Sequence, residues 1–218
     1  MTGLIQRDLL ISFRRLSKMS YIMEAVYFLF LLLFFNNIYG PLTFFLLATP
    51  INMSGLPNTM KEMDSNYRGM RSARLLPYSK KDIVRGRFLS AVCYQLFYIL
   101  EMILFAVCHH FIKGGLSPQV YLLFIAGGWL AGLFLTAVNL LTSFTSGLNT
   151  SAIIYLITIV LLVGGYLAFI FLGSRTGLSK QISSLNITWV LIIAVCFNIL
   201  FWFVSYSISV KCFEKNAY

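Results

Sequence analysis

Six long apolar stretches fill most of this 218-residue sequence. A helix needs about 20 mostly apolar residues to cross the hydrocarbon core of a bilayer. Hydrophobic residues make up 59% of the chain and charged residues only 11%, so polar side chains are too few to cover this much apolar surface in water. The sequence therefore predicts an all-α membrane protein, a single transmembrane domain over residues 1–218, with spans at 20–38, 39–56, 88–112, 119–141, 151–173 and 187–210.

The second of these spans is the weakest. It contains Pro41, Pro50 and Gly55, and its clean apolar core is short. Proline lacks a backbone N–H and interrupts the helical hydrogen-bond ladder, which a membrane helix tolerates where its neighbours satisfy the freed groups. We therefore expect this span to be kinked or partly unwound.

Basic residues are distributed unevenly among the loops. All but three of the 17 Lys and Arg residues lie before the first span, between the second and third spans, or after the last. The three on the opposite side are Lys113, Arg175 and Lys180. Cytoplasmic loops carry the excess of basic residues, so both termini are predicted in the cytoplasm, in agreement with an even number of spans. Topology accounts for the net charge of +10, and no nucleic-acid partner is expected.

Residues 1–18 have the pattern of an amphipathic helix. Leu9, Phe13 and Leu16 fall near one helical face, with Ile5 one turn earlier, whereas the basic residues favour the other face. Such a helix is typical of the membrane interface. The alternative is an ordinary positively charged flank of the first span.

The basic region 57–87 predicts two helices. Thr59 and Glu62 have the spacing of a capping box, and the helix that they start would run to about Leu75. It would carry an apolar stripe of Met60, Met63, Tyr67 and Met70, flanked by Lys61, Glu62, Asp64, Arg68 and Arg71. Methionine stripes suit adaptable docking surfaces. The alternative is a helix lying flat on lipid headgroups, attracted by its basic side chains.

A second helix is predicted after Pro77, which ends the first. Ser79 and Asp82 again have the spacing of a capping box. The helix that begins there would run directly into the span at 88–112.

Two acidic residues fall within the predicted spans. Glu24 lies near one end of the first span, and Glu101 lies near the middle of the third. A charge at mid-membrane costs at least about 2.5–3.5 kcal/mol, so we expect Glu101 to face protein, water or a partner, or to be held protonated. Helical spacing places four aromatic residues around it: Tyr94, Phe97, Tyr98 and Phe105. This face, with Glu24 as a further member of the substrate path, could receive a cationic, amphipathic substrate. The alternative is a structural hydrogen bond to a neighbouring helix.

Small residues also recur at helical spacing. Gly128 and Gly132 form a GxxxG pair, and Gly164 with Ala168 forms a similar pair. Both predict close packing between helices.

The sequence lacks the common motifs of nucleotide and metal chemistry. It has no GxxxxGK[ST] phosphate loop, no HExxH and no GxSxG. Its four cysteines lie singly, and the adjacent His109 and His110 would point in different directions on a helix. We therefore expect no catalytic residue, metal or cofactor in this chain.

A resemblance to a known family rests on the stretch "RLLPYSKKDIVRGRFLS". It is similar to the leucine-proline-x-serine-basic motif of bacterial ABC exporter permeases of the type-two family. The matching positions are Leu76, Pro77, Ser79, Lys80, Lys81, Ile83, Val84, Arg87, Phe88 and Leu89. Many members have lysine and tyrosine where this chain has Arg87 and Phe88. The short length most resembles the permease subunits of phenol-soluble modulin exporters.

The resemblance implies an ATP-driven exporter in the bacterial cytoplasmic membrane. Two permeases, expected to be a homodimer, would assemble with two separate ATPase subunits that hold ATP and Mg. The helix before Pro77 would be the coupling helix, and the uncharged loop 142–150 would make a second, smaller contact. The exported compounds would be amphipathic peptides or other hydrophobic or amphipathic molecules. The residues expected to dock on the ATPase are Met60, Glu62, Met63, Tyr67, Arg68, Met70 and Arg71.

Two other classes of function compete with export. A membrane scaffold or immunity protein would bind a peptide or protein partner without transporting it. An intramembrane enzyme would need a constellation of paired acids, histidines or cysteines, which the sequence does not show.

Overall fold

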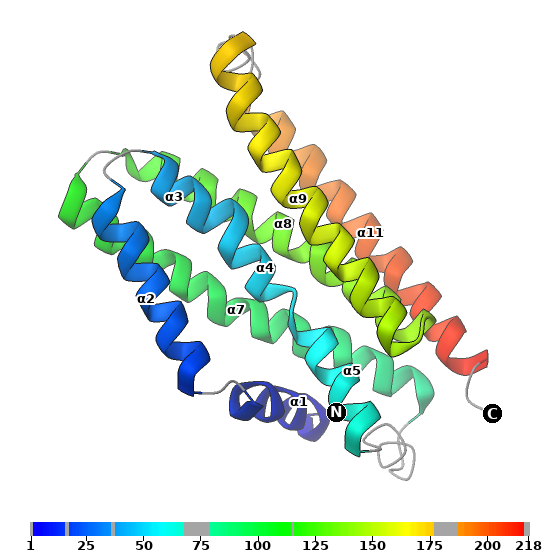
Figure 1. Cartoon of the computed structure of the whole chain (residues 1–218). Coiled ribbons are helices and arrows are strands. Elements are labelled where there is room, and N and C mark those ends of the chain that lie inside the picture. Colours follow the sequence, from blue (N-terminus) through cyan, green and yellow to red (C-terminus); the bar gives the residue numbers. More distant parts are fainter. Residues whose placement is uncertain are drawn as a thin grey trace.

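The computed structural model describes residues 2–15, 18–35, 38–67, 79–114, 116–176 and 187–215. Within these residues every regular element is a helix, as predicted (Figure 1). The helices are α1 (Thr2–Arg15), α2 (Lys18–Phe34), α3 (Tyr39–Thr43), the π-helix η1 (Phe44–Ala48), α4 (Thr49–Met53), α5 (Leu56–Tyr67), α7 (Lys80–Lys113), α8 (Pro118–Thr145), α9 (Leu148–Thr176) and α11 (Ile187–Lys215).

The helices form an elongated bundle in which α8 is central. It packs against α4, α7, α9 and α11. Figure 1 shows α9 and α11 side by side along one flank, with α2 and α3 on the opposite flank. At one end of the bundle α1 lies crosswise, beside α5 and the beginning of α7. Both chain termini lie at this same end (Figure 1).

Four of the described helices are long and apolar enough to cross a membrane. They are Lys80–Lys113, Pro118–Thr145, Leu148–Ala168 and Trp189–Lys215. The apolar part of α2, Ile22–Phe34, is shorter. A multi-pass membrane protein is therefore supported, whereas the predicted count of six spans is not confirmed.

The second apolar stretch is interrupted, as its prolines predicted. In η1 the register lengthens by one residue, because the backbone N–H of Thr49 bonds the carbonyl of Phe44. The hydroxyl of Thr49 donates to the same carbonyl at 2.8 Å, just before Pro50, which has no N–H to give. A turn at Ser54 and Gly55 then separates α4 from α5. We refer to α3, η1 and α4 together as the broken span.

Gly128 and Gly132 bring α8 against the broken span. A Cβ at Gly128 would lie 2.1 Å from the carbonyl oxygen of Phe45, and one at Gly132 would lie 2.6 Å from Met53 Sδ. Only glycine permits this approach, so the predicted close packing is confirmed here. Among the described residues no such atom lies within 4 Å of a Cβ at Gly164, so close packing at this glycine is not seen there.

The two capping boxes predicted in region 57–87 have different outcomes. The Ser79 box is confirmed: Ser79 Oγ accepts from the N–H of Asp82 at 3.1 Å, and Asp82 Oδ2 accepts from the N–H of Ser79 at 3.3 Å. The Thr59 box is wrong, because α5 already begins at Leu56 and the N–H of Thr59 bonds the carbonyl of Gly55 within the helix. The expected end near Leu75 lies outside the described residues.

The predicted amphipathic helix at residues 1–18 is present as α1, but it faces the protein differently. Its buried side is Leu4, Asp8 and Ser12, which spans polar as well as apolar positions. Leu9 and Phe13 pack partly against the core, and Leu16 lies outside the described residues. Helix α1 contacts both α5 and α7, so it is a packed part of the bundle. Its position at a membrane interface remains a prediction.

Candidate functional site

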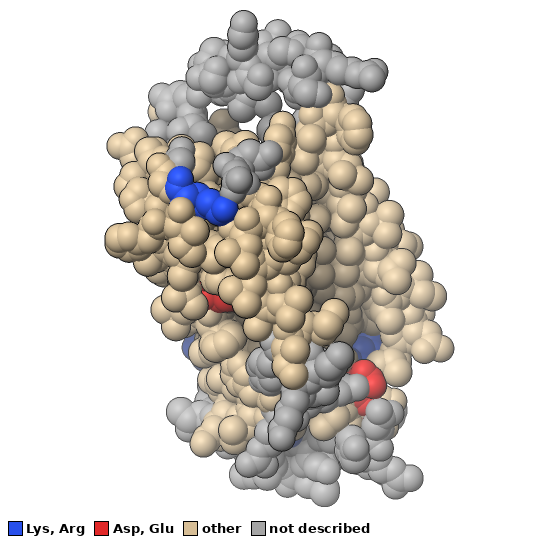
Figure 2. All heavy atoms as spheres, turned by 60° about the vertical axis from the view of Figure 1, so that its left-hand side comes forward, with Lys and Arg blue, Asp and Glu red and all other residues tan. Residues whose placement is uncertain are grey.

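One end of the bundle carries most of the described basic side chains. We call it the basic end and define it as α1, α5, the first turns of α7 and the last turns of α11. The opposite end carries Lys113. Figure 2 shows a largely uncharged surface between the two ends, interrupted by one acidic spot.

A buried ion cluster joins three helices at the basic end. Arg87 of α7 donates through Nη2 to Asp64 Oδ2 of α5 at 2.6 Å. Its Nε lies 3.4 Å from Asp8 Oδ2 of α1. The exposed fractions of the Arg87, Asp64 and Asp8 side chains are only 6%, 15% and 2%. We call these three residues the Arg87 cluster.

The Arg87 cluster holds one arginine and two aspartates, and neighbouring side chains offset its excess negative charge. Arg7 places Nη2 2.9 Å from Asp8 Oδ1, and Ser90 donates its hydroxyl to Asp8 Oδ2 at 3.4 Å. Burial raises the pKa of Asp64 above its ordinary value, and the charge and hydrogen bond of Arg87 partly offset this shift. Removing one partner from a buried ion pair costs about 3–5 kcal/mol. The three helices are therefore strongly held together at this point.

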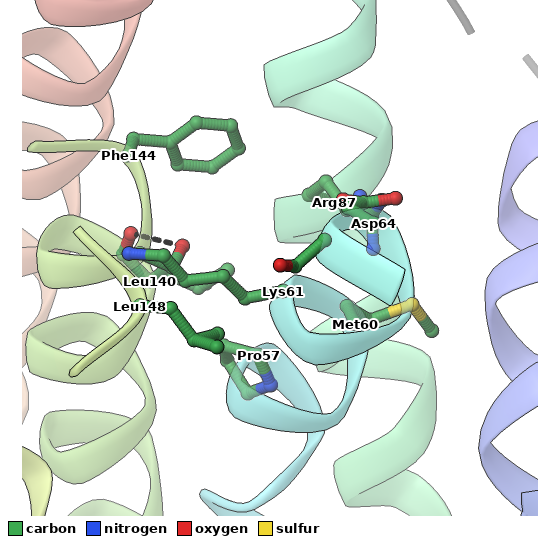
Figure 3. A pocket seen from close by; sticks show the side chains of 10 residues that line it. Pro57, Met60, Lys61, Asp64, Arg87, Leu140, Phe144 and Leu148 are labelled. Carbon is green, nitrogen blue, oxygen red and sulfur yellow. Dashed lines mark hydrogen bonds and ion pairs between the residues drawn. The ribbon is translucent and has the colours of Figure 1, made fainter. Parts of the chain in front are cut away.

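A cavity of about 310 Å³ lies beside the Arg87 cluster. Figure 3 shows Lys61 extending from α5 toward α8, while Arg87 and Asp64 lie together on another side of the cavity. Burial lowers the pKa of Lys61 to about 8. The residues that line the cavity are Pro57, Met60, Lys61, Asp64, Ser65, Arg87, Leu140, Ser143, Phe144 and Leu148.

Among the predicted docking residues whose side chains the structure describes, Met60 is covered by the protein itself. Met60 is only 4% exposed and belongs to the hydrophobic core, because α5 packs against α1, α7, α8 and α9. Glu62 and Met63 are half-buried, whereas Ser65 is exposed. The Tyr67 side chain, Arg68, Met70 and Arg71 lie outside what the structure describes. Met60 is therefore not accessible to a partner in this conformation.

Part of the aromatic face predicted around Glu101 lies in the interior of the described bundle. Tyr94, Tyr98 and Phe105 are buried, and the hydroxyls of the two tyrosines lie 3.1 Å apart. The Phe105 ring stacks on Phe44 of the broken span, with centroids 4.1 Å apart. These three side chains are therefore core residues in this conformation.

The other two residues of that predicted path lie nearer the surface of α7. Phe97 is 46% exposed and packs edge-on against Phe13 of α1, with centroids 5.3 Å apart. Glu101 is half-buried.

A line of polar side chains instead connects α2, the broken span and α9. Glu24 accepts from Asn52 Nδ2 at 3.0 Å. The Tyr155 hydroxyl donates to the carbonyl of Ile51 at 3.0 Å. Farther along α9, the hydroxyls of Tyr166 and Thr43 lie 2.7 Å apart. We call Glu24, Thr43, Asn52, Tyr155 and Tyr166 the polar stripe.

Glu24 is a candidate from the sequence, whereas the other members of the polar stripe were missed. Tyr155 and Tyr166 are three helical turns apart and so share a face, which was a readable signal. Asp8 and Asp64 were also missed as partners of Arg87. Asp8 is the single acidic residue before Glu24, amid basic residues, and this isolation was the available signal.

Comparison with known proteins gives one match. No curated protein and no solved structure matches this chain. A family model described as ABC-2 family transporter protein matches residues 3–214. Because that match covers nearly the whole sequence, the chain belongs to the ABC-2 family of transporter proteins, whose members are membrane transport subunits that are not catalytic by themselves.

Proposed function

We propose that this chain is the transmembrane subunit of an ATP-driven exporter whose energy comes from a separate ATPase. The ABC-2 family implies an ABC ATPase partner in general. The observation that carries the proposal for this chain is the Arg87 cluster. It ties α1 and α5, which lie at the basic end, to α7, which is long enough to cross the membrane.

The Arg87 cluster suits the transmission of force. A movement imposed on α5 at the basic end must either break the Asp64–Arg87 contact or carry α7 with it. Breaking a buried pair is expensive because it leaves an uncompensated charge. Movement of α7 together with α5 is therefore the less costly response, and it carries the motion into the spanning part of the bundle.

The ATPase would bind at the basic end, with ATP and Mg held by that subunit. Ser65 and, at the start of α7, Ser79, Lys80, Lys81 and Arg85 are exposed there. Region 57–87 thus retains the role inferred from sequence, but with the tip of α5 and the start of α7 as the contact. The assembly would contain two ATPases and two copies of this permease.

The topology we propose has six spans in the bacterial cytoplasmic membrane, with the basic end in the cytoplasm. Helix α2 and the broken span supply the two spans that fall short by length. Figure 1 shows α2 running away from α1 along the bundle, and the broken span returning beside α8 toward α5. The excess of basic residues at this end supports the orientation.

The polar stripe is the best candidate for the substrate path. A carboxylate is unfavourable on a surface that faces lipid, because a charge in hydrocarbon costs free energy. Glu24 and Asn52 nevertheless lie together near the surface of α2 and the broken span. An amphipathic peptide with a cationic group would find a carboxylate, hydroxyls and flanking aliphatic residues along this stripe. We therefore propose amphipathic, cationic compounds as the substrate class.

The proposal is tested in inside-out membrane vesicles that contain this chain and an ABC ATPase that copurifies with it. A fluorescent cationic amphipathic peptide is the probe. ATP should drive its accumulation, and an ATPase variant without its phosphate-loop lysine should abolish it. Saturable binding of the peptide with no ATP-dependent accumulation would favour the alternative of a non-transporting scaffold or immunity protein.

A further inference from the structure

The turn between α4 and α5 and the C-terminal end of α8 cap each other. Asn139 of α8 donates through Nδ2 to the carbonyl of Ser54 at 2.6 Å, where α4 ends. In return, Lys61 of α5 donates through Nζ to three carbonyls where α8 ends. These are the carbonyls of Ser146 at 2.6 Å, Gly147 at 3.1 Å and Thr142 at 3.3 Å.

Each of these contacts supplies a hydrogen-bond donor to backbone carbonyls at a helix C-terminus. The last carbonyls of a helix have no partner within it, and that end carries a partial negative charge. A lysine near the end satisfies both demands. Asn139 and Ser54 are both fully buried, and leaving the Ser54 carbonyl unpaired there would cost about 1–3 kcal/mol. Both contacts therefore give a helix C-terminus a defined hydrogen-bond partner.

The two contacts are in register. Lys61 follows Ser54 by seven residues, and Ser146 follows Asn139 by seven residues. At 1.5 Å per residue, both intervals are about 10 Å along a helix. Helix α5 thus runs beside the end of α8 in the same direction, held at two points. Two separated points fix the angle between two helices as well as their distance.

The connection continues into α9. The hydroxyls of Thr142 and Ser151 lie 3.3 Å apart across the turn that follows α8. Ser205 of α11 donates to the carbonyl of Ala137 on α8 at 2.8 Å. A displacement of α8 at this end therefore reaches both α9 and α11.

We infer that Lys61 and Asn139 are positioning residues that make α5 and the C-terminal end of α8 a single rigid body. This inference rests on the proposed function, because it assigns the route by which force on α5 reaches α8, α9 and α11. The Arg87 cluster serves α1 and α7, so α5 has two separate attachments. Loss of the Lys61 contact should leave ATP hydrolysis by the ATPase intact but uncouple it from movement of the spans.

Lys61→Met removes the ammonium but keeps much of the stem. Transport per ATP hydrolysed is expected to fall at least about fivefold, the lower end of a typical coupling free energy between sites, with hydrolysis itself changed less than about twofold. Lys61→Arg should retain more than half of the coupling. Asn139→Leu should resemble Lys61→Met. Lys113→Met is the matched control, because Lys113 Nζ also donates to a backbone carbonyl, that of Leu33, but at the opposite end. It should behave as wild type.

A second measurement is independent of transport. Spin labels at Ser65→Cys and Thr145→Cys, both exposed positions on α5 and α8, report the distance between these helices in a chain without its native cysteines. The distance distribution should be narrow in the parent and clearly broader with Lys61→Met, but not with Lys113→Met. An unchanged distribution with Lys61→Met overturns the rigid-body inference. A broadened distribution in a chain that shows no ATP-driven transport would instead contradict the proposed function alone.

Discussion

Arg87 and Asp64 form a 2.6 Å ion pair between α7 and α5, in a place where both side chains are largely withdrawn from solvent. The same guanidinium also reaches Asp8 of α1. Helix α5 of region 57–87 is therefore not a separate, projecting element of the structure. Helix α5 is packed into the bundle, and Arg87, which holds it there through Asp64, is separated from Asp64 by 23 residues in sequence.

Replacing Arg87 by Met should destabilise the protein strongly. Two carboxylates would remain buried without their shared partner, and the expected loss is about 3–5 kcal/mol in the free energy of unfolding. Arg85→Met is the matched control, because Arg85 is exposed two residues earlier on α7. Its effect should stay within about 0.5 kcal/mol. Denaturant unfolding in detergent measures both, and equal effects would contradict a cluster that holds the three helices.

Gly128→Ala should disturb the contact between α8 and the broken span. The new Cβ would meet the carbonyl oxygen of Phe45, and a backbone atom cannot turn away as a flexible side chain can. Overpacking of this kind costs about 1–3 kcal/mol. Gly164→Ala places the same methyl group in open space and should be neutral or slightly stabilising. Thermal unfolding of the two variants tests the pair, and a neutral Gly128→Ala would show that α8 packs differently.

The stability contributed by Lys61 should rise with pH. Burial lowers its pKa from 10.5 to about 8, so between these values the unfolded chain holds a proton that the folded chain has released. The free energy of unfolding therefore increases with pH relative to Lys61→Met. A neutral amine still has two N–H donors, so two of the three contacts with α8 can survive deprotonation.

Thermal unfolding between pH 7 and pH 9.5 measures this difference. The charged groups nearest Lys61 are Asp64 on α5 and Arg87 on α7, which line the same cavity, and Glu62 beside it in sequence. They are common to both proteins, so their effects largely cancel. A melting-temperature advantage of wild type that shrinks as pH rises would contradict the assignment.

Glu24→Gln should weaken export of cationic amphipathic compounds. The expected loss is about twofold to fivefold, which corresponds to one partly exposed ion pair. A neutral compound of similar size should be exported at the wild-type rate. Glu101→Gln on α7, whose carboxylate interacts electrostatically with that of Glu24, should have the smaller effect without lowering the amount of folded protein. Vesicle transport with the paired probes decides the matter, and equal losses for charged and neutral compounds would remove Glu24 from the path.

Local chemistry made part of the fold predictable. The Ser79–Asp82 box involves neighbours in sequence, and the interruption of the second apolar stretch follows from Pro41 and Pro50 within it. Gly128 and Gly132 were readable because close packing needs small residues at helical spacing. The Thr59 box failed because Pro57 is well tolerated in a first helical turn, which let α5 begin earlier.

The candidate site was harder to predict because its contacts are distant or involve the backbone. Nothing local to Arg87 indicates that Asp8 and Asp64 meet on it. The Lys61 contacts are with carbonyls, which every residue has, so residue types give no signal. Met60 matched a docking stripe, but one stripe of a helix can equally pack inside the bundle, and the neighbours of α5 decided which.

We propose that a separate ATPase engages the basic end of this permease. Site-specific photo-crosslinking in intact membranes tests it most directly, with the crosslinker placed either at Ser65, exposed at the tip of α5, or at Phe111, 83% exposed toward the other end of α7. The crosslinker at Ser65 should capture an ATPase with a phosphate loop, and the crosslinker at Phe111 should not. Capture of such an ATPase from Phe111 alone, or from neither position in a chain that supports ATP-driven transport, would contradict it.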